Sequence, residues 1–459
     1  MGRPRKVLSE QAQKDIVATQ AVIDDKTKDV QSLRGMRDTL PQDQKYWQFI
    51  YSKLIPIVEA YGFSRIDTPI LESTSLFKRT IGTDTDIVSK ELFSFIDKNG
   101  DDICLRPEGT AAVVKAYIEH GMFSEVQPVK LYYIGPMYRH EKPQDQRFRQ
   151  FHQFGFEIIG DRSPILDVEL ILLVTELYKE LGIGTPNVEI NNVGCKKCRT
   201  EYKQALLSYY KSRRYKICSN CNDRLSRNPF RVLDCKEDRC IEAKEGAPNF
   251  VDYLCDECQG YFIKTLEHLD ALKISYNLNN YLVRGLDYYT KTTFEVWSSN
   301  DKGGKHALGG GGRYDYLIED LCGRDVPACG YAGGIERLIA AMKENNVVVP
   351  EKKKADVFLA HLGEQAKIKS LILFEELRKE GVTVAHNLSK NQLRSQLEIA
   401  NKSGTRLVLI LGQKEVLDGT IIIRDMDSGG QEVINFDKIP TEIKKRLEKL
   451  NQTHKEVNL

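Results

Sequence analysis

The 459-residue chain has no apolar run that approaches the roughly 18 residues of a membrane-spanning helix. Its charged amino terminus also lacks the apolar segment of a secretory signal. A large excess of one charge is missing too, because the formal net charge is only +2. We therefore expect a cytoplasmic protein without membrane association, in which any nucleic-acid contact comes from local basic patches.

Disulfides are not favoured, because the eleven cysteines are odd in number and no export signal is visible. Eight cysteines form four close pairs, which are Cys195/Cys198, Cys218/Cys221, Cys235/Cys240 and Cys255/Cys258. From Cys195 to Cys240, thirteen Lys or Arg accompany five Asp or Glu. This basic, cysteine-rich block predicts an insertion over residues 187–276, with thiols that are either reduced or bound to tetrahedral zinc.

Two runs of alternating polar and aromatic residues predict an antiparallel hairpin with one polar and one apolar face. The first run ends with Met137-Tyr-Arg-His-Glu141, and the second is Arg147-Phe-Arg-Gln-Phe-His-Gln-Phe-Gly-Phe-Glu157, with a polar loop (142–146) between them. Guanidinium forks bind phosphate oxygens bidentately, so these arginines suit a nucleoside triphosphate. Ordinary solvated surface arginines are the alternative.

The hairpin resembles motif 2 of class II aminoacyl-tRNA synthetases, and in particular its version in histidyl-tRNA synthetases. The histidyl version is recognised in Tyr133-Ile-Gly-Pro-Met-Tyr-Arg-His-Glu141 and in Arg149-Gln-Phe-His-Gln153. A helix expected over 42–61, followed by a strand over 63–70 that Pro69 interrupts, resembles motif 1. Gly333-Gly-Ile-Glu-Arg-Leu338 resembles motif 3.

The resemblance spans roughly residues 33–450 and implies a histidine–tRNA ligase. Such an enzyme makes histidyl-adenylate and pyrophosphate from L-histidine and ATP with Mg²⁺. It then transfers histidine to the 3′-terminal adenosine of tRNA(His). The resemblance further implies a homodimer whose two-fold interface contains the 47–61 helix and the 66–71 strand.

The implied fold class is α+β, with a class II antiparallel sheet of six or seven strands flanked by helices. Strands alternate with helices after residue 355, which predicts a mostly parallel α/β domain that resembles the anticodon-binding domain. The length suits roughly three domains. We expect a polar extension (1–32), a catalytic core (33–186 and 277–350), a mostly helical insertion (187–276) and the anticodon-binding domain (355–459).

Four residues are implied to bind ATP by the family pattern. Arg139 contacts the α-phosphate and Arg147 the distal phosphates, while Glu141 orients the adenine end. Arg337 lies on the γ-phosphate side. Fixed cations of this kind stabilise the charge that spreads over phosphate oxygens during activation.

A site that selects histidine needs buried polar partners for both ring nitrogens. The family pattern assigns Glu157, Tyr288 and Tyr289 to the ring, and Glu108, Thr110 and Gln153 to the α-amino group. Arg284 and Arg139 are the implied catalytic residues. The full implied set for histidine is Glu108, Gly109, Thr110, Arg139, Gln153, Glu157, Arg284, Tyr288 and Tyr289.

Two strings near the end of the core carry the histidyl signature, namely Arg284-Gly-Leu-Asp-Tyr-Tyr289 and Leu308-Gly-Gly-Gly-Gly-Arg-Tyr-Asp315. The glycine run lets a strand pass close under the substrate. For Arg284, an arginine packed in an ion pair with Asp287 is the alternative to a catalytic role. Thr110 is expected to cap the helix that follows it.

Two further alternatives concern metal and activity. The family does not require a metal in the insertion, so reduced cysteines are favoured there and structural zinc is the alternative. Synthetase-like regulatory subunits, which sense histidine for a phosphoribosyltransferase, typically lack the anticodon domain and the catalytic arginine. This chain retains residues 355–450 and Arg284, which favours the ligase.

Overall fold

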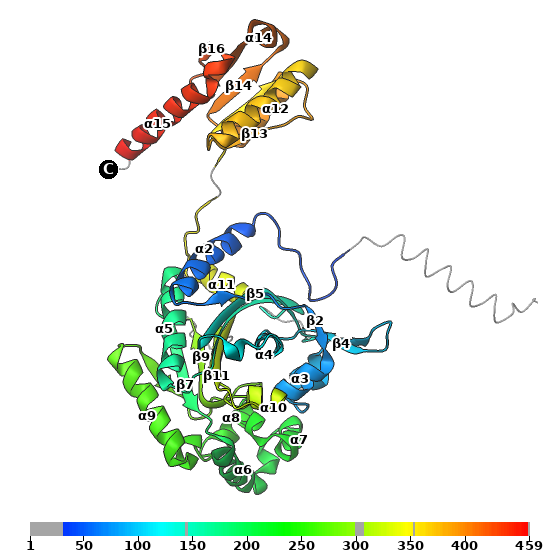
Figure 1. Cartoon of the computed structure of the whole chain (residues 1–459), viewed down its shortest axis with the longest axis vertical. Coiled ribbons are helices and arrows are strands. Elements are labelled where there is room, and N and C mark those ends of the chain that lie inside the picture. The colour runs from blue at the N-terminus through cyan, green and yellow to red at the C-terminus, as the bar shows by residue number, and fades with distance from the viewer. Residues whose placement is uncertain (1–30, 143–145, 299–306, 352–353, 458–459) are drawn as a thin grey trace, which may run out of the picture. The chain divides into compact units, whose positions relative to one another are not determined.

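The computed structural model describes residues 31–142, 146–298, 307–351 and 354–457 (Figure 1). The chain divides into two compact units, Met1–Pro350 and Glu351–Leu459. Residues 1–30 of the predicted extension and residues 143–145 of the predicted hairpin loop lie outside the described residues. In the described part, no helix combines the length and hydropathy needed to cross a membrane.

An eight-stranded sheet forms the framework of the first unit, in the order β1-β5-β6-β11-β10-β9-β7-β8. Its six central strands are antiparallel: β5 (Val129–Tyr138), β6 (Gln150–Ile159), β11 (Ala328–Gly334), β10 (Gly309–Arg313), β9 (Thr290–Trp297) and β7 (Asn187–Asn192). The short edge strands β1 (Ser64–Arg65) and β8 (Tyr276–Leu278) pair in parallel. The predicted antiparallel class II sheet is confirmed, and two parallel edges extend it.

Helices cover both faces of this sheet. One core contains residues of α2 (Gln44–Ala60), α5 (Pro164–Glu180), α9 (Asp256–Ala271) and α11 (Ile335–Glu344). The other contains residues of α4 (Thr110–Glu119), α10 (Leu317–Cys322) and the insertion. Successive side chains of a strand point to opposite faces, so Tyr132 of β5 packs in the first core and Tyr133 in the second.

The predicted helix of motif 1 is confirmed as α2, which buries Trp47, Ile50, Leu54 and Val58 on one stripe. The strand expected over 63–70 is wrong beyond its first residues, because only Ser64–Arg65 is a strand. Pro69 has no N–H for the ladder, so the chain leaves the sheet near it. It then enters a small sheet of β2 (Leu71–Ser73), β4 (Asp102–Leu105) and β3 (Ser94–Ile96).

The remaining elements of the core are short. After β2 come α3 (Thr74–Ile81) and a π-helical turn (Ile87–Glu91), and a 3₁₀ turn (Met122–Ser124) follows α4. Between β7 and β8 the chain is helical, as the predicted insertion requires. Its elements are α6 (Lys196–Lys211), α7 (Ser219–Arg227), α8 (Asp238–Lys244) and α9, with 3₁₀ turns at Arg214–Lys216, Pro229–Val232 and Phe250–Tyr253.

The second unit has a five-stranded sheet in the order β13-β12-β14-β15-β16. Its strands are β12 (Val357–His361), β13 (Val384–His386), β14 (Leu407–Leu411), β15 (Thr420–Asp425) and β16 (Gln431–Asn435). Its helices are α12 (Glu364–Lys379), α13 (Leu393–Lys402), α14 (Gln413–Asp418) and α15 (Ile439–Val457), with a 3₁₀ turn at Phe436–Lys438.

The prediction of a mostly parallel sheet in this unit is only half right. Strands β12, β13 and β14 are parallel, but β15 and β16 pair antiparallel. A parallel crossover needs a dozen or more residues. The connections 412–419 and 426–430 are shorter than that, so each joins antiparallel neighbours.

Candidate active site

A cleft of about 410 Å³ opens on the sheet where the β5–β6 hairpin faces the 284–289 loop. Ten of the residues predicted from the sequence line it: Glu108, Thr110, Arg139, Glu141, Arg147, Gln153, Arg284, Tyr288, Tyr289 and Arg337. Gly109 and Glu157 do not line it, but Gly109 stands between Glu108 and Thr110 in the chain, and Glu157 accepts a hydrogen bond from Thr110. Residues far apart in sequence therefore meet in one place.

Four guanidinium groups converge on this cleft. Arg139 follows β5 and Arg147 precedes β6, while Arg284 precedes β9 and Arg337 lies in the first turn of α11. Burial lowers the pKa of Arg337, and the charges of Arg147 and Arg139 lower it further. Like charges that repel one another in this way are stabilised when an anion binds between them.

Arg139, Arg147 and Arg337 are each anchored on one side and have further donors to offer. Arg139 Nε donates to the Pro107 carbonyl at 2.9 Å, and Arg337 Nη1 donates to the Ala307 carbonyl at 2.7 Å. Arg147 Nη1 lies 3.4 Å from a carboxylate oxygen of Glu141. A guanidinium has five N–H donors, so these contacts leave several for a ligand.

Arg284 forms an ion pair with Glu295 of β9 and not with Asp287. Burial acts to lower the pKa of Arg284, but Glu295, Tyr289 and Tyr288 together outweigh it, and the net pKa lies above the ordinary value. The Asp287 carboxylate instead accepts from Asn228 Nδ2 at 2.7 Å. Arg284 is therefore packed in an ion pair, as the structural alternative expects, but its partner is Glu295 and not Asp287.

The glycine run of β10 makes room for this arginine. A Cβ built on Gly310 would lie 2.4 Å from Arg284 Nη1, which is far inside van der Waals contact. Any other residue at position 310 would displace the guanidinium. The sequence-based idea that the glycines allow a close approach is thus supported, although the group that approaches Gly310 is a side chain of the protein itself.

The turn between β4 and α4 is organised by the carboxylate of Glu108. Glu108 is buried, and its two oxygens accept from the amides of Thr110 and Ala111, each at 2.8 Å. Gly109 is the N-cap residue, so the prediction that Thr110 caps the helix is wrong and Glu108 fills that role. A Cβ on Gly109 would lie 2.3 Å from the Tyr133 ring, which explains the glycine.

Glu157 of β6 is completely buried directly under this corner. Its Oε1 accepts from the Thr110 hydroxyl at 2.8 Å, and its Oε2 accepts from the Tyr314 hydroxyl. Burial raises the pKa of Glu157 to about 8, although the two hydroxyl donors act to lower it. The carboxyl group is therefore mostly protonated at neutral pH.

Aromatic rings form the wall beside this carboxyl group. Tyr288 and Tyr289 lie with their ring centroids 4.8 Å apart, and Tyr288 meets the Tyr314 ring edge-on at 5.4 Å. The Oε1 atom of Gln153 and the hydroxyl of Tyr133 are buried, and among the described residues neither has a hydrogen-bond partner. Such atoms are costly unless a ligand pairs with them.

Sequence reasoning missed three members of this site, namely Tyr133, Glu295 and Tyr314. Tyr314 stands in the Arg-Tyr-Asp string, so its position after the glycines was a usable signal. Tyr133 also stands in a quoted motif. Glu295 has no local signal, because the sheet register alone sets it opposite Gly310.

Comparisons with known proteins identify the family of the chain. A family model described as histidyl-tRNA synthetase matches residues 35–203 and 242–338. A second model, described as anticodon binding domain, matches residues 347–446. Residues 204–241, which contain the inner part of the insertion, lie outside both matches.

Curated relatives and solved structures give the same result. A histidine–tRNA ligase of Dehalococcoides mccartyi is 43% identical over 417 residues, which are 91% of this chain and 100% of that protein. The ligase of Thermosipho melanesiensis is 45% identical and covers 89% of this chain and 96% of its own. Apo histidyl-tRNA synthetase of S. aureus superposes with a TM-score of 0.75 at 35% identity, covering 91% and 100% of the two chains.

A Bacillus halodurans C chain described as an ATP phosphoribosyltransferase regulatory subunit/histidyl-tRNA synthetase superposes less closely. Its TM-score is 0.61 at 22% identity, covering 84% of this chain and 99% of that one. At this identity the likeness extends to the fold alone.

Proposed function

The chain belongs to the histidyl-tRNA synthetase family, and we propose that the cleft described above is where it activates histidine. The chain is an aminoacyl-tRNA ligase. It converts L-histidine and ATP into histidyl-adenylate and pyrophosphate, and it then transfers histidine to the 3′-terminal adenosine of tRNA(His).

The proposed activation step is an in-line displacement at the α-phosphate of ATP. A carboxylate oxygen of histidine attacks the α-phosphorus, the bond to the β-phosphate oxygen breaks, and pyrophosphate leaves. Arg139 and Arg284 flank the α-phosphate in this proposal and stabilise the charge on its oxygens. Arg147 and Arg337 bind the distal phosphates, and Glu141 orients the adenine end.

Mg²⁺ fits the carboxylates that face this cleft. The ion usually keeps several waters and binds one or two carboxylates together with substrate phosphates. Glu295 lines the cleft beside Arg284 and would supply one of those oxygens. When bound, the ion would neutralise part of the phosphate charge, while the guanidinium groups orient the chain of phosphates.

Histidine is proposed to bind with its ammonium group at the Glu108 corner and its ring toward the tyrosines. The oxygens of Glu108, Thr110 and Gln153 accept hydrogen bonds from the ammonium group, and the Oε1 of Gln153, which has no partner among the described residues, supports this assignment. The imidazole lies against Tyr288 and Tyr289, with Glu157 below them. A site whose buried polar groups require such partners rejects analogues that lack them.

The observation that carries the proposal is the convergence of four guanidinium groups beside one unpartnered amide oxygen. ATP–pyrophosphate exchange tests it: exchange should require histidine, and the other standard amino acids should not replace it. A histidine sensor, the rival of the same fold, would bind histidine without supporting exchange.

We further propose that the protein is a homodimer and acts in the cytoplasm. Ile70, Leu71, Phe95 and Ile96 in the region of the small sheet expose 41–65% of their surface, which leaves apolar area there for a second copy to cover. The apolar stripe of α2 is already buried within the chain, so at such an interface α2 would present its other face. The second unit is proposed to bind the anticodon arm of tRNA(His), as its family match suggests.

A further inference from the structure

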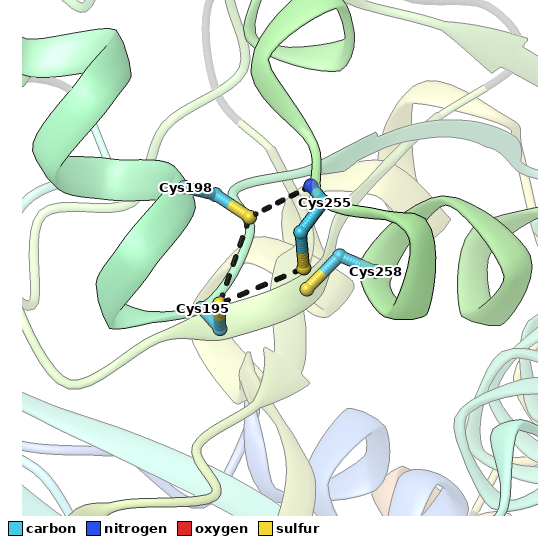
Figure 2. Close-up of side chains that lie close together, drawn as sticks. All are labelled: Cys195, Cys198, Cys255 and Cys258. Atoms are coloured by element: carbon cyan, nitrogen blue, oxygen red, sulfur yellow. Dashed lines mark hydrogen bonds between the residues drawn. The ribbon is translucent and has the colours of Figure 1, made fainter.

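The eight cysteines of the insertion gather into two groups of four. The outer tetrad consists of Cys195, Cys198, Cys255 and Cys258, and the inner tetrad of Cys218, Cys221, Cys235 and Cys240. Within each tetrad the four Sγ atoms lie within 4.8 Å of one another. Figure 2 shows the outer tetrad, whose side chains come together from the starts of α6 and α9.

The sulfur separations match a single tetrahedral ion. Cys195 Sγ lies 3.6 Å from Cys198 Sγ and 4.0 Å from Cys255 Sγ. In the inner tetrad, Cys218 Sγ and Cys235 Sγ are 3.9 Å apart. A zinc ion with Zn–S bonds of about 2.3 Å holds its sulfurs roughly 3.8 Å apart.

Other uses of four cysteines fit these separations poorly. A disulfide brings its sulfurs to about 2.05 Å, so none of these pairs is bonded. A four-iron cluster binds each thiolate to a different iron atom. Four sulfurs within 4.8 Å of one another leave no room for its cage.

The local backbone favours the thiolate form, which is the form that binds metal. Cys195, Cys218 and Cys255 are the N-cap residues of α6, α7 and α9, where the helix dipole stabilises negative charge. Backbone amides also donate to sulfur. The Cys255 amide lies 3.1 Å from Cys198 Sγ, and the Cys218 amide lies 3.1 Å from Cys240 Sγ.

The backbone turn that leads into the outer tetrad requires a glycine. Gly194 has a φ of +60°, and a Cβ built on it would lie 2.4 Å from the Cβ of Cys198. Near the inner tetrad, Arg224 and Lys244 interact electrostatically with Cys235. Four thiolates around one divalent cation carry a net charge of −2, which nearby cations offset.

From these observations we propose that each tetrad binds one structural zinc ion, so that every chain carries two. The sequence alone favours reduced, packed cysteines in the insertion. In this proposal these cysteines are instead thiolate ligands, and they release their protons as each ion binds. Neither ion takes part in histidine activation.

The two ions would secure the insertion against the histidine site. Arg231 lies four residues before Cys235 of the inner tetrad, and its Nη1 donates to the Gly285 carbonyl at 3.2 Å, next to Arg284. At the outer tetrad, Arg199 of α6 donates to the carbonyls of Asp287 and Tyr289 at 3.0 and 2.9 Å. Each ion thus supports an arginine that positions the 284–289 loop.

Metal analysis of the full-length protein tests this proposal directly. The protein is purified under reductant, without chelator and without added metal, and we expect about two zinc ions per chain. Cys198→Ser and Cys221→Ser should each remove one ion, because they lie in different tetrads. Cys322→Ser is the matched control, since Cys322 is exposed and belongs to neither tetrad, and it should keep both.

A second measurement uses wild-type protein, so it does not depend on whether the cysteine variants fold. Wild-type protein loaded with Co²⁺ should show the absorption of tetrathiolate cobalt, with an intensity that corresponds to two ions per chain. Zinc removal by a chelator should lower Tm and expose eight thiols to a labelling reagent. Less than about 0.2 zinc per chain in folded, reduced protein would overturn the proposal. So would a single ion per chain, or iron in place of zinc.

Discussion

Replacing Arg284 with alanine should slow histidine activation by ~10²- to 10³-fold, because it removes a preorganised cation that we propose lies beside the α-phosphate. The structure explains why this group is preorganised. Glu295 holds one edge of the guanidinium, and Gly310 leaves the space in which it lies. Nothing has to move when charge develops on the phosphate, so the whole contribution of about 2.7–4 kcal/mol is lost with the side chain.

The same substitution should also reduce stability, because it leaves the Glu295 carboxylate without its cation. The Glu295 side chain is only 20% exposed, so an unpaired charge there costs about 1–3 kcal/mol. Adding Glu295→Gln to Arg284→Ala should restore much of that stability without restoring the rate. Arg284→Lys should remain impaired, since one compact charge cannot reproduce the planar fork.

Pyrophosphate exchange at saturating histidine and ATP measures the rate, and thermal unfolding measures the stability. Arg324→Ala is a suitable control, because Arg324 is exposed and does not line the cleft. It should leave exchange near the wild-type rate. Near-normal exchange by folded Arg284→Ala protein would refute the catalytic role. An Arg284→Ala defect that Glu295→Gln fully rescues would indicate a purely structural role.

Three further outcomes follow from the site and the fold. Burial raises the pKa of Glu157 from 4.5 to about 8, so the proton that it binds in the folded state contributes stability that is fully present below about pH 4.5 and is lost as the pH rises through 8. The Tm of wild type should therefore fall relative to Glu157→Gln between pH 5 and 9, and Tm curves that run parallel for the two proteins would contradict the raised pKa. Deleting residues 355–459 should spare some exchange but sharply reduce tRNA charging, and equal charging by the truncated dimer would remove the tRNA role of that unit. Light scattering should give a dimer at micromolar concentration that Phe95→Asp weakens, and a stable wild-type monomer would contradict the proposed interface.

The sequence predicted those parts of the fold that depend on local pattern. The α2 stripe and the β5–β6 hairpin follow from periodicity, and both are confirmed. The strand through Pro69 was wrong because periodicity ignores the missing amide. The mixed sheet of the second unit was missed because the short connection between β14 and β15 was not weighed, and because β16 is short and mostly exposed and carries little apolar pattern.

The site was predictable to the extent that its residues stand in recognised motifs. Those motifs identify the arginines and tyrosines of the site but not the residues that form ion pairs or hydrogen bonds with the site residues. Glu295 reaches Arg284 only through the register of β9 against β10. Tyr314 follows directly after β10, and its hydroxyl reaches Glu157 of β6 only through the folding of the sheet. The pairing of cysteine pairs into tetrads likewise depends on how α6, α7, α8 and α9 fold back on one another.

One measurement tests the central claim most directly. The purified chain is mixed with labelled histidine and ATP in the presence of pyrophosphatase, and tRNA(His) is added afterwards. The account predicts about one protein-bound histidyl-adenylate per intact cleft, followed by transfer of the label to the 3′ end of the tRNA. Histidine that binds without forming adenylate, or adenylate that never reaches tRNA, would contradict it.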